Sequence, residues 1–178
     1  MSDLDLLETE RLVLSGWRAD QVDDLYRLHG DPVVARYLTE HGQPWSKDEM
    51  DTAIAHWIAL YERQKMGKLR VTRKADGVLV GRCGFGVYGP DETPEIGYSL
   101  FPEFWGNGYV FEAASALRDW YWRETDRDHF IARSVITDNA IPDAWIAASV
   151  LQHGERLATF DKDFLRLLPP AHLELLTT

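Results

Sequence analysis

The spacing of apolar residues in the first part of the chain predicts one strand followed by helices. Residues 11–14 place apolar side chains between charged ones, as a short strand does. Apolar residues then recur at helical spacing over residues 22–28, between Asp20, expected to cap this helix, and Gly30, expected to end it. Two more helix starts are predicted by their capping residues: Asp31-Pro32, and the capping box of Ser46 and Glu49, whose helix is expected to stop at Gly67.

The middle of the chain predicts three strands and then a helix. Apolar runs at residues 69–72 and 78–85 flank the turn Ala75-Asp76-Gly77, and Asp-Gly between two such runs indicates a hairpin. Residues 95–100 form the third predicted strand. The turn Gly106-Asn107-Gly108 then opens a strongly amphipathic helix.

The last part of the chain predicts strands that alternate with helical segments. Residues 130–135 and 157–160 are predicted strands on either side of a helix over 142–154. A helical turn at 164–167 and a last strand at 172–176 follow. Antiparallel strands succeeded by strand–helix–strand crossovers predict an α/β fold, in which one mixed sheet carries helices on both faces.

Composition narrows the class of protein. A length of 178 residues fits one ordinary domain or two very small ones, and 45% hydrophobic with 27% charged residues excludes wholesale disorder. No apolar run approaches the roughly 20 residues of a membrane span, and the acidic residues 1–5 do not resemble a secretion signal. The single cysteine, Cys83, excludes a disulfide framework. We therefore expect a cytoplasmic protein without a membrane partner.

Charge and side-chain spacing argue against nucleic-acid and metal chemistry. A net charge of −10 disfavours a large nucleic-acid surface, because phosphate binding needs Lys and Arg. The six histidines show no pair at metal-ligand spacing and have no cysteine partner, so no metal is expected. Cys83 lies in a strand-like run and is predicted to be a buried small hydrophobe rather than a nucleophile.

The glycine turn at residues 106–108 is the most informative local feature. A strand that runs into a glycine turn and then a helix brings unpaired backbone N–H groups to the positive end of the helix dipole. Glycine also lets the backbone approach a ligand closely. The turn by itself leaves two interpretations open, a site for phosphate or another anion and a simple tight turn.

Segments spread over residues 7–139 match one family in the family's order. They are Leu7-Glu8-Thr9-Glu10-Arg11-Leu12-Val13-Leu14, Trp17-Arg18, Asp31-Pro32, Arg36-Tyr37-Leu38, Gly81-Arg82-Cys83-Gly84, Glu95-Ile96-Gly97-Tyr98, and Trp105-Gly106-x-Gly108-Tyr109 with Glu112-Ala113. This part of the chain resembles the GNAT N-acetyltransferases, in particular the branch that acetylates ribosomal-protein N-termini. The resemblance implies acetyl-CoA as cosubstrate and a primary amine, either a protein N-terminus or a small amine, as acceptor.

The resemblance also implies roles for particular positions. Glu95 would take the amine proton, through water, although a solvated charge at a strand end explains the residue equally well. Val110 departs from the family, which has Gly or Ala there, and its bulk would crowd the diphosphate. The implied cofactor-binding set is the backbone of Tyr98, Ser99 and Leu100 for the pantetheine arm, the amides of Trp105, Gly106, Asn107, Gly108, Tyr109 and Val110 for the pyrophosphate, and Asn139.

The tail departs from the GNAT pattern. Asn139 is present, but Pro142 stands where the family has Ser. The segments Asp143-Ala-Trp-Ile-Ala-Ala148 and Thr159-Phe-Asp161-Lys-Asp163-Phe164 instead resemble the end of a PIN-domain ribonuclease. The chain is therefore interpreted as a single-domain chimera, with a GNAT-like part over 1–139 and a PIN-like part over 140–178.

The chimera implies a GNAT-like three-layer fold in which a PIN-like helix–strand–strand completes the sheet. The GNAT resemblance implies an antiparallel hairpin at the end of the sheet, with its final strand beside the strand at 130–135. We instead expect the strand at 157–160 to dock there in parallel, with 172–176 at the edge. Of the PIN-type carboxylates only Asp143 and Asp161 survive, and they make at best a weak Mg²⁺ site.

Three functions follow from these interpretations. The first is an acetyl-CoA-dependent N-acetyltransferase, acting as a monomer or homodimer. The second is a folded chimera with impaired or no catalysis. The third, disfavoured by the acidic charge and the missing ligands, is a Mg²⁺-dependent ribonuclease.

Overall fold

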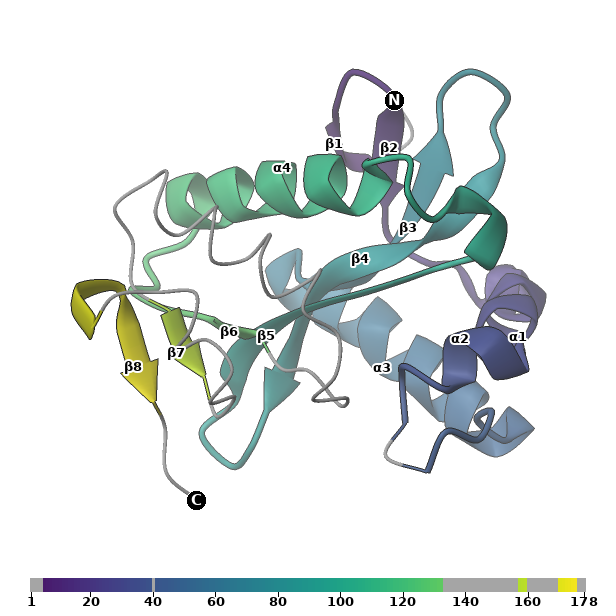
Figure 1. Cartoon of the computed structure of the whole chain (residues 1–178), viewed down its shortest axis with the longest axis horizontal. Coiled ribbons are helices and arrows are strands. Elements are labelled where there is room, and N and C mark those ends of the chain that lie inside the picture. The colour runs from purple at the N-terminus through teal and green to yellow at the C-terminus, as the bar shows by residue number, and fades with distance from the viewer. Residues whose placement is uncertain (1–4, 40, 133–156, 160–169, 176–178) are drawn as a thin grey trace.

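The computed structural model describes residues 5–39, 41–132, 157–159 and 170–175. The strands in these residues form one eight-stranded sheet whose spatial order follows the chain (Figure 1). They are β1 (Asp5–Glu8), β2 (Leu12–Ser15), β3 (Gly67–Arg73), β4 (Leu79–Tyr88), β5 (Thr93–Leu100), β6 (Ile131–Ala132), β7 (Leu157–Thr159) and β8 (Leu173–Leu175). Neighbours from β1 to β5 are antiparallel, and those from β5 to β8 are parallel. The mixed α/β sheet predicted from the sequence is confirmed.

Helices cover both faces of this sheet. The helices α1 (Val22–His29), α2 (Pro32–Ala35) and α3 (Lys47–Gln64) lie on one side, and α4 (Tyr109–Glu124) lies on the other (Figure 1). Short 3-10 turns at Ala19–Gln21, Pro102–Phe104 and Pro170–His172 complete the described elements. A three-layer arrangement results.

Local capping explains where several helices begin. The Ser46 side chain accepts from the Glu49 amide, and the Glu49 carboxylate accepts from the Ser46 amide at 2.7 Å, as predicted. The Asp31 carboxylate accepts from the Val33 amide at 2.7 Å at the start of α2. These caps depend on residues two or three positions apart, so the sequence alone could predict them.

Three local expectations need correction. Asp20 does not cap α1, because it lies inside the 3-10 turn and its carboxylate pairs with Arg18 at 3.0 Å. The α3 helix ends at Gln64 rather than at Gly67, because its C-cap Lys65 adopts a left-handed conformation with φ 56°. Strand β1 was not predicted, because four residues with acidic ends carry little periodic signal.

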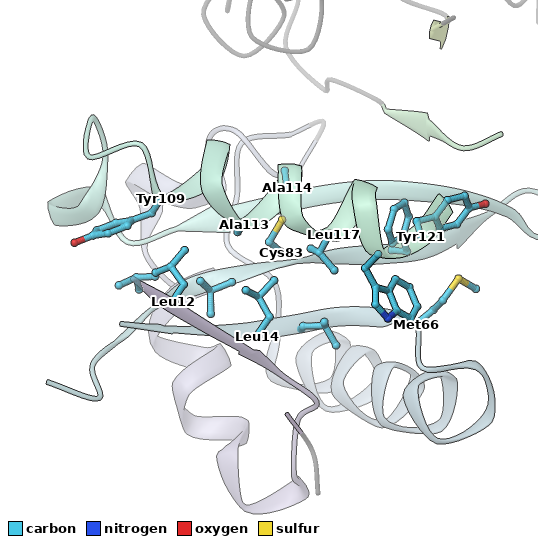
Figure 2. Close-up of a cluster of buried hydrophobic side chains, with 14 of the residues drawn as sticks. Leu12, Leu14, Met66, Cys83, Tyr109, Ala113, Ala114, Leu117 and Tyr121 are labelled. Carbon is cyan, nitrogen blue, oxygen red and sulfur yellow. The ribbon is translucent and has the colours of Figure 1, made fainter. Parts of the chain in front are cut away.

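The core between α4 and the sheet positions the glycine turn. Figure 2 shows Ala113, Ala114, Leu117 and Tyr121 of α4 facing side chains from the strands, among them Cys83. Small residues on α4 allow the helix to lie close to the sheet. The N-terminus of α4 is therefore held rigidly beside the end of β5.

The predicted parallel arrangement of the tail is confirmed for the described residues. Ile131 of β6 pairs with Ala158 of β7, and β7 pairs with β8 from Leu157–Leu173 to Thr159–Leu175, all in parallel. The GNAT pattern implied an antiparallel hairpin at this end. The helix predicted over 142–154 and the helical turn at 164–167 lie outside the described residues.

Candidate active site

The glycine turn forms an open helix N-terminus at the end of β5. Gly106 and Gly108 both have φ near +75°, a conformation that glycine adopts without strain. No side chain caps α4, so the N–H groups of its first turn have no intrahelical partner. A Cβ built on Gly106 would meet no atom within 4 Å. This combination of open space, N–H donors and helix dipole favours an anion.

Arg11 holds this turn from a distant part of the chain. Its Nε lies 2.6 Å from the Glu112 carboxylate, and its Nη1 donates to the Asn107 carbonyl at 3.0 Å. Its guanidinium also lies over the Tyr109 ring, 4.7 Å from the centroid. The Thr9 hydroxyl contacts the same carboxylate. Arg11 thus binds both the turn itself, at Asn107, and the first turn of α4, at Glu112. No role for its side chain was predicted from the sequence.

A second guanidinium stands beside the same turn. Arg73 Nη1 donates to the Tyr109 hydroxyl at 3.5 Å, and its guanidinium lies 5.1 Å from the centre of the Phe104 ring. Its other partner is Asp76, at 2.6 Å. Arg11 and Arg73 therefore flank Tyr109 at the start of α4, and each is ion-paired with a carboxylate.

The bulky residues of the first helical turn point in different directions. Val110 is partly buried and packs against the core beneath α4, whereas Phe111 is 49% exposed. The predicted crowding of the diphosphate by Val110 stays a prediction. Its side chain has a packing role that the sequence analysis did not foresee.

Strand β5 offers its backbone and two kinds of side chain. Tyr98 packs against the core on the α4 side, while Ser99 is buried among the residues on the other face. The Leu100 carbonyl accepts a hydrogen bond from the Trp105 indole at 2.9 Å, which occupies one of its two acceptor positions. The predicted role of this backbone toward a pantetheine arm stays a prediction.

Glu95 is placed by Lys68 of β3. The Lys68 ammonium donates to the Glu95 carbonyl at 3.0 Å and lies 3.7 Å from its carboxylate. The Glu95 side chain is 24% exposed, so it reaches solvent from a fixed strand position. A carboxylate held in this way is available to accept a proton, and its role as base stays a prediction.

Glycines on β4 and β5 make room for Lys68. A Cβ on Gly97 would lie 2.7 Å from the Lys68 nitrogen, and a Cβ on Gly86 would lie 3.1 Å from its Cε. Burial lowers the pKa of Lys68 to about 8, against the opposing effect of Glu95. Glycine at these two positions leaves the space that the end of the Lys68 side chain occupies.

Replacing Lys68 with Met is expected to remove a pH-dependent part of the stability. Between pH 8 and 10.5 the unfolded chain holds the Lys68 proton and the folded chain does not, so rising pH favours the folded state there. The wild type therefore gains about 3 kcal/mol of unfolding free energy from Lys68 over this pH range. Lys68→Met lacks this gain, so we expect its stability to fall behind that of the wild type by the same amount as the pH rises. Urea unfolding at pH 7 to 10.5 measures it.

The variant is compared with the wild type at each pH because Cys83, which both proteins contain, changes the stability with pH in the direction opposite to Lys68. Burial raises the pKa of the Cys83 thiol to about 12, which lowers stability as pH rises through the usual thiol range. Lys47→Met, at an exposed lysine, is the matched control and should show no such change. Parallel pH profiles for Lys68→Met and the wild type would contradict the placement of Lys68.

The comparisons with known proteins decide the family. Residues 11–141 match the acetyltransferase (GNAT) domain family. The chain belongs to the GNAT acetyltransferase family. This confirms the family inferred from the segments before residue 139, and the match ends close to the point at which the tail departs from the GNAT pattern.

Individual GNAT relatives cover part of the chain. It is 26% identical over 113 residues to the uncharacterized N-acetyltransferase YoaA of Bacillus subtilis (strain 168), an alignment that spans 63% of each protein. An acetyltransferase structure from Agrobacterium tumefaciens str. C58 superposes with a TM-score of 0.67 at 24% identity, over 80% of each chain. The structure of the RimL ribosomal L7/L12 alpha-N-protein acetyltransferase in complex with coenzyme A superposes with a TM-score of 0.66 at 20% identity. The superposition covers 82% of this chain and 81% of the RimL chain. The two structures establish a shared GNAT fold.

Several predicted residues of the GNAT chain lie outside the described part. Asn139, Asp143 and Asp161 all fall there, so their predicted roles stay predictions.

Nothing in the comparisons supports the resemblance of residues 140–178 to a PIN-domain ribonuclease. Within the described residues no group of three or more His, Cys, Asp or Glu is placed to hold a metal ion. None of the helices described there is long and apolar enough to cross a bilayer.

Proposed function

We propose that this GNAT chain is an acetyl-CoA-dependent N-acetyltransferase whose acceptor is a primary amine. The observation that carries the proposal is the exposed glycine turn at the start of α4, where Gly108 supplies no side-chain cap and Arg11 binds the Asn107 carbonyl. A diphosphate is the anion that best matches such a terminus in this family. The similarity to a GNAT structure with coenzyme A supports the same assignment.

The binding roles follow the order of residues along β5 and α4. The amides from Trp105 to Val110 receive the diphosphate, with Arg11 holding the turn in shape. The backbone of Tyr98, Ser99 and Leu100 receives the pantetheine arm, apart from the acceptor position of Leu100 that Trp105 uses. Asn139 belongs to the same proposed set. The bound cosubstrate supplies an acetyl group as a thioester.

Glu95 prepares the acceptor for attack. Its carboxylate accepts a proton from the acceptor's ammonium group through one water, which leaves a neutral amine. The amine nitrogen then bonds to the thioester carbon and becomes cationic, and the C–S bond breaks with its electron pair on sulfur. The nitrogen loses one N–H proton and the leaving thiolate gains one, so that an amide and a free thiol result. Lys68 acts as a positioning residue, because it contacts both the carbonyl and the carboxylate of Glu95.

The finer assignments belong to the same proposal. The acceptor is a protein N-terminus or a small amine, and the similarity to RimL favours the ribosomal-protein branch. The chain works as a single cytoplasmic domain, as a monomer or homodimer, without nucleic acid.

Titration with acetyl-CoA tests the proposal. Calorimetry is expected to give saturable binding, and a panel of primary amines is expected to give acetyl-CoA-dependent thiol release. Absence of binding at millimolar acetyl-CoA would overturn the proposal.

A second candidate is a folded GNAT–PIN chimera with impaired or no turnover. The parallel β6, β7 and β8 favour it, since the GNAT pattern implied an antiparallel hairpin there. In the family this terminal region helps to wall the acceptor cleft. The expected result for this candidate is binding of acetyl-CoA without thiol release for any amine in the panel.

A further inference from the structure

A row of polar side chains crosses the sheet on the face opposite α4. Arg70 of β3 pairs in register with Arg82 of β4, and Arg82 pairs with Ser99 of β5, so the three side chains share one face. His29 of α1 joins the row, because Arg82 Nε donates to its Nε2 at 2.8 Å. Trp45 and Trp57 lie around this end, with the Arg82 guanidinium 5.3 Å from the Trp57 ring centre.

Each member of this row has a polar atom without a partner. In the part of the chain that the structure describes, the buried side-chain atoms that make no hydrogen bond are His29 Nδ1, Arg70 Nε, Arg82 Nη1 and Ser99 Oγ. His29 is fully buried, and Arg82 and Ser99 are each 6% exposed. A buried polar group without a partner costs about 1–3 kcal/mol, more if it is charged. The described residues therefore supply no acceptor for four donor-capable atoms in one row.

All four atoms can donate a hydrogen bond. The guanidinium nitrogens of Arg70 and Arg82 only donate, and the Ser99 hydroxyl does so by rotation. His29 accepts at Nε2 from Arg82, and burial together with Arg82 lowers its pKa well below its usual value. The neutral ring therefore carries its proton on Nδ1. A group that binds any of these atoms must therefore be an acceptor.

The charges around the row point to an anion. Arg70 is paired with Asp24 at 2.6 Å, and Lys68 has Glu95 at 3.7 Å. Arg82 contacts no carboxylate among the described residues, and its only hydrogen-bond partner there is the neutral His29. Burial lowers the pKa of Arg82 to about 10, against the opposing effects of Cys83 and of the Glu95 carboxylate, which lies near Arg82 without contacting it. A buried cation is stabilised by a paired anion far better than by a neutral water.

The row lies within reach of the proposed reaction. Ser99 is four residues from Glu95 on the same face of β5, which corresponds to about 13 Å along a strand. The start of α4, where the diphosphate is proposed to bind, belongs to the helix on the other face (Figure 1). The row and the start of α4 therefore lie on opposite faces of the sheet, and the row shares its face with the Glu95 side chain.

We infer that Arg82, with Ser99, His29 and Arg70, binds a carboxylate or phosphate group of the acceptor, so that the acceptor is an acidic amine. The inference rests on the proposed acetyl transfer and deepens it. Glu95 and Ser99 are about 13 Å apart along the strand, so an acceptor that reaches both has the length of a short peptide. Arg82 is the specificity-determining residue, because it is the buried cation without an acidic partner in the row.

Acetyl transfer to matched peptides tests this preference. The acceptors are four tripeptide amides that differ only at the third position. One pair has aspartate or asparagine there, and the other pair has phosphoserine or serine. In each pair we expect the wild type to favour the acidic peptide over the neutral one by at least about tenfold in kcat/KM. The pair with the larger ratio shows whether the bound group is a carboxylate or a phosphate. Arg82→Gln is expected to abolish the preference, and Ser99→Ala to reduce it about threefold. Arg123→Gln, at an exposed arginine of α4, is the matched control.

Thermal melting gives a readout that does not depend on activity. Inorganic phosphate, compared with chloride at equal ionic strength, is expected to raise the Tm of the wild type and of Gly106→Asp, which lacks the proposed diphosphate site. The rise is expected to disappear in Arg82→Gln. If Arg82→Gln does not fold, Ser99→Ala and Arg82→Lys are compared in its place, and both should show a smaller rise.

The outcomes separate the two proposals. Equal kcat/KM for acidic and amide peptides, together with a phosphate effect that Arg82→Gln retains, would overturn the inference and leave acetyl transfer intact. An Arg82-dependent phosphate effect without acetylation of any amine would support the anion site and count against the proposed function.

Discussion

Replacing Gly106 with Asp is expected to weaken acetyl-CoA binding by at least about 100-fold. The new carboxylate would stand in the open space beside the first-turn amides of α4, where the diphosphate is proposed to lie. Two like charges about 5 Å apart repel by about 3 kcal/mol at an effective dielectric constant of 20, which corresponds to more than a hundredfold in affinity. Calorimetric titration of the purified variant with acetyl-CoA measures the loss.

Gly89→Asp is the matched control for this substitution. Gly89 has φ +71°, and a Cβ there also meets nothing within 4 Å, so the variant carries the same backbone strain and the same charge on the loop between β4 and β5. We expect it to bind acetyl-CoA like the wild type. Unchanged affinity of Gly106→Asp would contradict the assignment of the glycine turn.

Replacing Glu95 with Gln is expected to lower kcat by about 10²–10³-fold while the affinity for acetyl-CoA stays unchanged. The amide keeps the size of the side chain but cannot accept the proton of the acceptor's ammonium group. The expected signature is loss of rate near neutral pH with partial recovery at high pH, where the amine is already neutral. Thiol release measured from pH 6 to 10 gives this profile.

Glu62→Gln, at an exposed carboxylate of α3, controls for the loss of one negative charge. It is expected to leave kcat unchanged. A kcat for Glu95→Gln equal to that of the wild type would instead assign Glu95 to the other interpretation of the sequence, a solvated charge at a strand end.

The sequence predicted the elements around the site because their signals are local. The capping box of Ser46 and Glu49 and the glycine turn each lie within a few residues, so backbone preference alone determines them. Family segments spread over residues 7–139 added the order of these elements. Asp20 failed as a cap because an equally local interaction, its pairing with Arg18, competed for the same carboxylate.

The partners of the site residues were beyond sequence reasoning. Arg11 reaches the glycine turn across 96 residues, and Lys68 reaches Glu95 across 27. Nothing in the periodicity of β2 or β3 marks these cations as different from any exposed Lys or Arg. The space for Lys68 of β3 depends on Gly97 of β5, and β4 lies between these two strands.

By itself, the sequence identified the family through the resemblance of segments over residues 7–139, and it predicted the strands and helices from β2 to α4 and the glycine turn that opens α4. These elements and the turn are encoded by short-range conformational preference and by the spacing of apolar residues. Only the tertiary structure decided that Lys68 supports Glu95, that Arg11 fastens the turn, and that Arg82 is buried without an acidic partner. The reason is physical: strand register brings distant side chains onto one face of the sheet, and burial then makes an unpaired charge costly.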